Sequence, residues 1–132
     1  MKIPLQVYPF AGGLRIMVSF LLRYEDPHMF LPIQAIVDTG SPITILGIAD
    51  LKRARVSFLQ LKKLESRKEP IAMGGGQLNT KILRSAKLKF ENLLESSLNI
   101  LIPTEEVQGI SPPTILGVDF LIENKLKLIF NP

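Results

Sequence analysis

The stretch Gln34-Ala35-Ile36-Val37-Asp38-Thr39-Gly40-Ser41-Pro42-Ile43-Thr44-Ile45-Leu46 decides the fold. Its first residues are mostly apolar and predict a buried strand, and residues 43–46 predict a second strand. The polar residues between them predict a turn, which Gly40 allows to be tight. Asp38 would then stand at a strand end among apolar neighbours, where a carboxylate has to be neutralised, paired or hydrogen-bonded.

Two further motifs follow this stretch along the chain. Ile71-Ala72-Met73-Gly74-Gly75-Gly76-Gln77-Leu78 is glycine-rich, and Pro113-Thr114-Ile115-Leu116-Gly117-Val118-Asp119-Phe120-Leu121 lies near the C-terminal end. With Asp38-Thr39-Gly40-Ser41 they resemble the flap, the Ile-Leu-Gly element and the active-site loop of the retroviral-type (retropepsin-like) aspartic protease family. The three motifs occur in the family's order. The resemblance implies an all-β fold, the closed β-barrel of acid proteases, with a flap hairpin and one short C-terminal helix.

The composition limits the class of protein. The chain has 132 residues, 46% hydrophobic and 21% charged, which predicts a single folded domain over residues 1–132. It has no cysteine, which excludes a disulfide framework, a thiolate nucleophile and a cysteine-ligated zinc site. No apolar run is long enough to cross a bilayer and no signal peptide is evident, so we expect a cytoplasmic protein without membrane contact.

The remaining pattern predicts short, closely spaced strands, which favours an antiparallel β architecture. Strands are expected over 2–8, 14–24, 30–38, 85–90, 98–102 and 125–130, and short helices over 47–55 and 118–124. The last strand is apolar on both faces near its end and has to be covered. In the family it resembles, the chain termini pair across a dimer interface, which makes 2–8 and 125–130 candidates for that pairing. Burial of the last strand within one monomer is the alternative.

A count of catalytic carboxylates predicts the assembly. Aspartic protease chemistry uses two neighbouring carboxylates that share a proton: one activates a water and the other donates to the scissile carbonyl. The chain contains one Asp-Thr-Gly, and Asp26, Asp50 and Asp119 lack this context. The second carboxylate is therefore expected to be Asp38 of another copy, in a C2 homodimer.

The resemblance also assigns roles to neighbouring residues. Thr39 would hydrogen-bond across the two loops, Gly40 would let the backbone approach water and substrate, and Ser41 would hydrogen-bond an outer carboxylate oxygen. The flap residues that would close over an extended peptide are Ala72, Met73, Gly74, Gly75 and Gly76. The implied substrate is a peptide or protein, with no metal and no cofactor.

Three alternatives accompany this interpretation. The chain could be a peptide-binding or dimerisation module that keeps the retropepsin fold with little or no proteolytic activity. The basic segment 52–68 could bind nucleic acid, but only Phe58 supplies an aromatic ring, so a solvated face is favoured and no nucleic acid is expected. His28 with Glu25 and Asp26 could bind a metal, although such a loop cluster is more often solvated.

Overall fold

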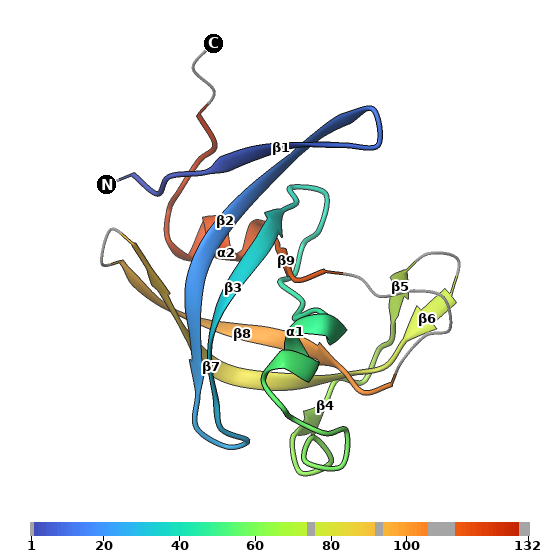
Figure 1. Ribbon diagram of the computed structural model, residues 1–132. Helices are drawn as coiled ribbons and strands as arrows, with labels where there is room; N and C mark the ends of the chain where they lie inside the picture. The colour runs from blue at the N-terminus through green and yellow to red at the C-terminus, as the bar shows by residue number, and fades with distance from the viewer. Residues whose placement is uncertain (1, 74–75, 92–93, 106–112, 130–132) are drawn as a thin grey trace.

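Strands dominate the computed structural model, which describes residues 2–73, 76–91, 94–105 and 113–129. Its elements are β1 (Gln6–Phe10), β2 (Gly13–Tyr24), β3 (Met29–Val37), α1 (Ile48–Arg53), β4 (Glu65–Ser66), β5 (Ile71–Met73), β6 (Gly76–Leu78), β7 (Thr80–Phe90), β8 (Glu95–Pro103), β9 (Ile115–Leu116) and α2 (Val118–Glu123) (Figure 1). In the described part of the chain, no helix has the length and apolar character needed to cross a membrane.

One sheet of seven strands organises the molecule. The order β4-β7-β2-β3-β9 forms its path, with β1 added to β2 and β8 added to β7, while β5 and β6 form a separate hairpin. The pairings are antiparallel except for β9, which runs parallel to β3. This exception matters for the position of Asp38. Strand β9 comes from a segment far along the chain and pairs with the end of β3, directly before Asp38.

Alternating side chains on β2 and β3 build the core. On β2, Val18, Phe20 and Leu22 are buried, and the residues between them are exposed. Phe20 packs on Phe90, and Phe90 packs on Phe120 of α2, with ring centroids 5.4 Å and 5.1 Å apart. The tilted arrangement of these rings suits their quadrupoles and joins α2 to the sheet.

Most of the strands and helices were predicted from the sequence. Before the chain's midpoint the short strand β4 was not predicted, and two predicted strands differ. Strand β1 begins at Gln6 rather than at residue 2. The expected strand over 43–46 is reduced to isolated bridges at Ile45, which pairs with both Leu101 and Ile115. The backbone there divides its hydrogen bonds between two different segments, so it cannot extend either ladder.

The strand predicted over 125–130 is not formed within the single chain, since residues 126–129 have no strand conformation there. The chain turns sharply at Lys125, which adopts a φ of 53°, and Leu126 then packs against the core. Alternation alone cannot make a strand without a partner, and none of the described strands pairs with this segment. Phe130 lies outside the described residues.

Candidate active site

Asp38 is presented by a tight turn at the end of β3. Its backbone N–H donates to the carbonyl of Leu116 at 3.0 Å, which continues the parallel pairing of β3 with β9. The Gly40 N–H donates to Asp38 Oδ1 at 2.9 Å, and the Ser41 N–H donates to the Asp38 carbonyl at 3.1 Å. Asp38 is half-buried, whereas Thr39 and Gly40 are exposed. The carboxylate is therefore held by backbone on one side and open on the other.

Gly117 lies directly behind this turn. The N–H of Val118 donates to the Ser41 carbonyl at 2.8 Å, which ties the start of α2 to the loop. A Cβ placed on Gly117 would stand 2.7 Å from the Ser41 carbonyl oxygen and 2.7 Å from the carbonyl carbon of Ile43. Only glycine permits this approach, which gives the Ile-Leu-Gly motif a physical reason.

Thr44 and Asp119 form a polar brace beneath the loop. The Thr44 hydroxyl donates to Asp119 Oδ1 at 2.7 Å, and the Thr44 N–H donates to Oδ2 at 3.0 Å. The same hydroxyl oxygen accepts the Gly117 N–H at 3.0 Å. Thr44 has no solvent exposure. One buried hydroxyl after the Asp38 turn thus bonds to two groups of residues 117–119, the segment that lies behind that turn.

Sequence reasoning missed this brace. It considered Asp119 as an unsuitable second catalytic carboxylate and gave Thr44 no role. The available signal was a lone polar residue, Thr44, between apolar Ile43 and Ile45, because such a residue in a buried segment requires a partner.

Removal of the Thr44 hydroxyl should destabilise the fold. In Thr44→Val the shape is kept, but the Gly117 N–H and the Asp119 carboxylate each lose a buried partner. We expect the free energy of unfolding to fall by about 2 kcal/mol, measured by urea denaturation. Thr44→Ser keeps the hydroxyl and should lose less; an equal loss in the two variants would show that packing, and not the hydrogen bonds, is responsible.

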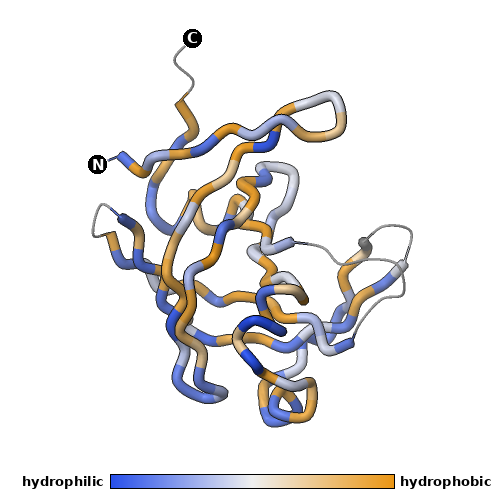
Figure 2. Tube along the Cα trace, viewed as in Figure 1, coloured by the Kyte–Doolittle hydropathy of each residue, from blue (hydrophilic) through white to orange (hydrophobic). Residues whose placement is uncertain are grey.

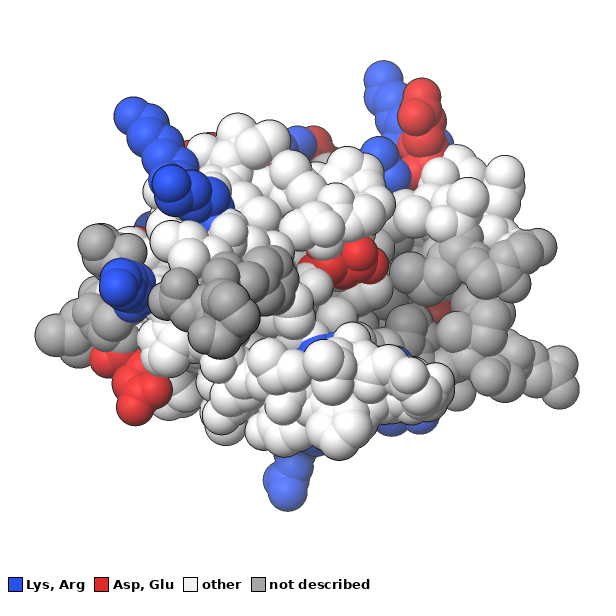
Figure 3. Space-filling model, turned by 90° about the horizontal axis from the view of Figure 1, so that it is seen from above, with Lys and Arg blue, Asp and Glu red and all other residues white. Residues whose placement is uncertain are grey.

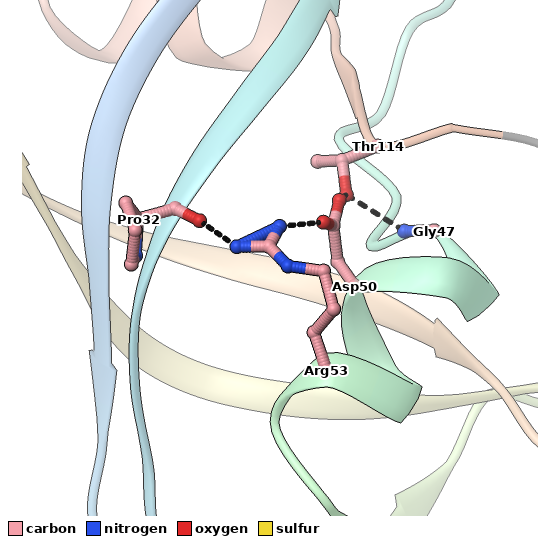
Figure 4. Close-up of polar contacts among 5 residues, drawn as sticks. All are labelled: Pro32, Gly47, Asp50, Arg53 and Thr114. Atoms are coloured by element: carbon pink, nitrogen blue, oxygen red, sulfur yellow. Dashed lines mark hydrogen bonds and ion pairs between the residues drawn. The ribbon is translucent and has the colours of Figure 1, made fainter.

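A second brace holds the residue that precedes β9 (Figure 4). The Thr114 hydroxyl accepts the Gly47 N–H at 2.8 Å and donates to Asp50 Oδ2 at 2.6 Å. Arg53 donates through Nη1 to Asp50 Oδ1 and through Nη2 to the Pro32 carbonyl, both at 2.6 Å. Helix α1 therefore fastens β9 to β3, and Arg53, within the basic segment, is paired with groups of the chain itself.

The predicted flap region contains a two-stranded hairpin. Ala72 of β5 pairs with Gln77 of β6, and Ile71 pairs with Leu78, whose side chain is buried. Figure 1 shows this hairpin at one side of the molecule, apart from the main sheet. The predicted tip residues Gly74 and Gly75 lie outside the described residues.

The expected role of Ser41 is wrong in this structure. Its hydroxyl donates to the Ile43 carbonyl at 2.8 Å instead of reaching the Asp38 carboxylate, so it stabilises the turn. In the loop cluster near His28, Asp26 pairs with Lys63. Across the described ranges, no group of three or more potential metal-ligating side chains is placed to hold a metal ion.

Comparison with solved structures identifies the fold. EIAV protease complexed with the inhibitor HBY-793 superposes with a TM-score of 0.56 over 93% of this chain and 100% of that chain, at 21% sequence identity. No family model and no curated protein sequence matches the chain. The chain therefore has an all-β, retropepsin-like fold with a short C-terminal helix, as the three motifs predicted.

Proposed function

We propose that the chain is an aspartic endopeptidase, active as a homodimer with one Asp38 carboxylate from each copy. The observation that carries the proposal is the Asp38-Thr39-Gly40 turn, braced from behind by Gly117 and Thr44 and exposed in front. Such bracing suits a catalytic group, because catalysis depends on a carboxylate held in one geometry.

The other aspartates that the structure describes support a second copy as the source of the partner carboxylate. Asp50 is bonded to Thr114 and Arg53, and Asp119 is bonded to Thr44. Asp26 is paired with Lys63 in a distant loop. All three carboxylates already have hydrogen-bonding or ion-pair partners, so the described part of the chain offers no free aspartate as a partner for Asp38.

The proposed chemistry follows from two such carboxylates that share one proton. The ionised Asp38 takes a proton from a bound water, whose oxygen attacks the scissile carbonyl carbon. The protonated Asp38 of the other copy donates its proton to the carbonyl oxygen. A tetrahedral diol results; its collapse breaks the C–N bond as a proton passes to the departing nitrogen. Thr39, exposed beside each carboxylate, would hydrogen-bond across the two loops.

The substrate would be an extended peptide. Hairpin β5–β6, including Ala72, Met73 and Gly76, would cover it, and main-chain hydrogen bonds would add the peptide as a strand, with alternate side chains in pockets. The predicted tip residues Gly74 and Gly75 would complete this cover.

Cleavage of a mixed peptide library from acid to neutral pH tests the proposal. We expect cleavage with a bell-shaped pH profile, because one proton must be shared, and we expect specific activity to fall on dilution as dimers dissociate. A peptide analogue with a hydroxyl in place of the scissile carbonyl should bind far more tightly than its parent peptide, because it resembles the tetrahedral state.

Two outcomes would contradict the proposal. A fully active monomer in sedimentation would exclude the shared site. A dimer that binds the analogue and its parent peptide equally, and cleaves nothing, would favour the peptide-binding module instead.

A further inference from the structure

An apolar stripe on β2 continues beyond the core of the molecule. Leu14, Ile16, Val18, Phe20 and Leu22 alternate along β2 and therefore share one face of the sheet. Leu22 is fully buried, Val18 is 2% exposed, and Leu14 at the far end is 73% exposed. The stripe begins as core and ends uncovered by the residues that the structure describes.

Strand β1 widens this stripe. Val7 pairs with Ile16 and Pro9 pairs with Leu14, so these four residues share the core-side face of the β1–β2 hairpin, here called the hairpin face. Val7 is 56% exposed and Pro9 is also exposed. The turn at Ala11 and Gly12 has positive φ at both residues, which suits a tight and well-defined hairpin. Figure 2 shows apolar residues along both of its strands.

The opposite face of the hairpin is chemically different. Gln34 of β3 donates to Gln6 Oε1 at 3.0 Å and to the Tyr8 hydroxyl at 3.2 Å. The Arg15 guanidinium lies 3.3 Å from the centre of the Phe10 ring, a cation–π contact. Gln6 and Tyr8 are thus bonded to β3. On the hairpin face, by contrast, Ile16 is half-buried and the other three side chains are exposed in the part of the chain that the structure describes.

The hairpin stands beside the Asp38 turn. Met17 and Ile36 form the last pair of the β2–β3 ladder, and Asp38 follows two residues later. Where β3 leaves the sheet at this turn, β2 continues with β1 as the hairpin (Figure 1). Figure 3 shows the molecule from the side toward which the hairpin projects. The described surface is largely uncharged across its middle, where acidic atoms and a smaller patch of basic atoms are visible between uncharged side chains.

We propose that the hairpin face, Val7, Pro9, Leu14 and Ile16, packs against a second copy of this chain beside the shared Asp38 site. The inference rests on the proposed function, since a second carboxylate must approach Asp38 from the open side of its turn. Under C2 symmetry the hairpin of each copy makes the same contact with the other copy, so a single apolar face is covered in both copies. The hairpin contact would add buried area to the contact between the two Asp38 turns and bring the interface closer to the area that a stable dimer needs.

Leu14→Asp tests the hairpin face, with Leu59→Asp as a matched control. Leu59 is similarly exposed, at 70%, but lies in the loop after α1. The new carboxylate would be buried in an apolar contact in both copies. We expect Leu14→Asp to raise the dimer dissociation constant by at least about tenfold in sedimentation, and Leu59→Asp to leave it unchanged.

A cysteine-free chain permits a second readout. In Leu14→Cys, thiol labelling should slow severalfold as the protein concentration passes the dissociation constant, whereas labelling of Leu59→Cys should not change. Three results would overturn the inference. They are equal dissociation constants for the two Asp variants, a wild type that stays monomeric, and labelling at position 14 that is slow at every concentration. A wild-type dimer that does not cleave peptides would overturn the proposed function, and the sedimentation result would still decide the role of the hairpin.

Discussion

Asp38→Asn should reduce peptide cleavage by roughly 10⁴-fold or more. In the proposed homodimer one substitution changes both carboxylates, so the general base and the general acid would be lost together. An amide neither accepts the proton of the water nor donates an acidic proton to the carbonyl. The measurement is the initial rate on the peptides that the wild type cleaves, across the full pH range.

The same variant should fold normally. The amide oxygen of Asn can still accept the Gly40 N–H, which is bonded to Asp38 Oδ1 in the wild type. We expect the free energy of unfolding to stay within about 1 kcal/mol of the wild-type value. When exchanged into wild-type protein at ninefold excess, the variant should lower wild-type activity to about one tenth, because most wild-type chains then pair with an inactive partner. Retained cleavage in Asp38→Asn, or no interference on mixing, would contradict the shared site.

Gly117→Ala should be the most destabilising single-methyl change at the site. The new Cβ would meet the backbone of Ser41 and Ile43 at 2.7 Å, and neither segment can withdraw easily because Ile45 and Val118 fix both by hydrogen bonds. We expect the free energy of unfolding to fall by roughly 3 kcal/mol, together with a loss of cleavage as the Asp38 turn is displaced. Urea denaturation and the peptide assay measure the two effects.

Gly13→Ala is the matched control for that experiment. A Cβ on Gly13 would find only the Phe10 carbonyl oxygen, at 3.7 Å, which is an ordinary contact. Its effect on stability should be within about 0.5 kcal/mol. A similar loss in both variants would mean that the close approach behind the Asp38 turn is not what requires glycine.

Local patterns were enough to predict most elements and the fold. The alternation over β2 and β3, the Asp-Thr-Gly turn and the glycine of the Ile-Leu-Gly motif each reflect a constraint visible within a few residues. The comparison with EIAV protease supports the same fold. What the sequence does not reveal is the pairing of distant polar residues, such as Thr44 with Asp119 and Thr114 with Asp50.

The failed strand predictions have a common cause. Residues 43–46 and 126–129 have strand-like composition, but strand formation requires a neighbouring strand at the right spacing. Ile45 forms bridges with two different segments, at Leu101 and at Ile115, so neither pairing continues as a ladder. After Lys125 the turn carries the chain away from the sheet. The exposure of the hairpin face was not predicted, for a related reason. Alternating apolar residues predict a buried strand, but they do not tell whether the residues that bury it belong to the same chain or to another copy.

The bonds that complete the Asp38 turn have a consequence for biosynthesis. Thr44 is 75 residues from Asp119 in sequence, and the Asp38 N–H donates to the carbonyl of Leu116, which is also far along the chain. Such long-range closures form late in folding. During translation the Asp38 turn therefore leaves the ribosome long before the segment that rigidifies it, and the nascent chain emerges with this turn unbraced. Proteolytic competence would arise only once synthesis has passed Asp119 and two finished chains have met.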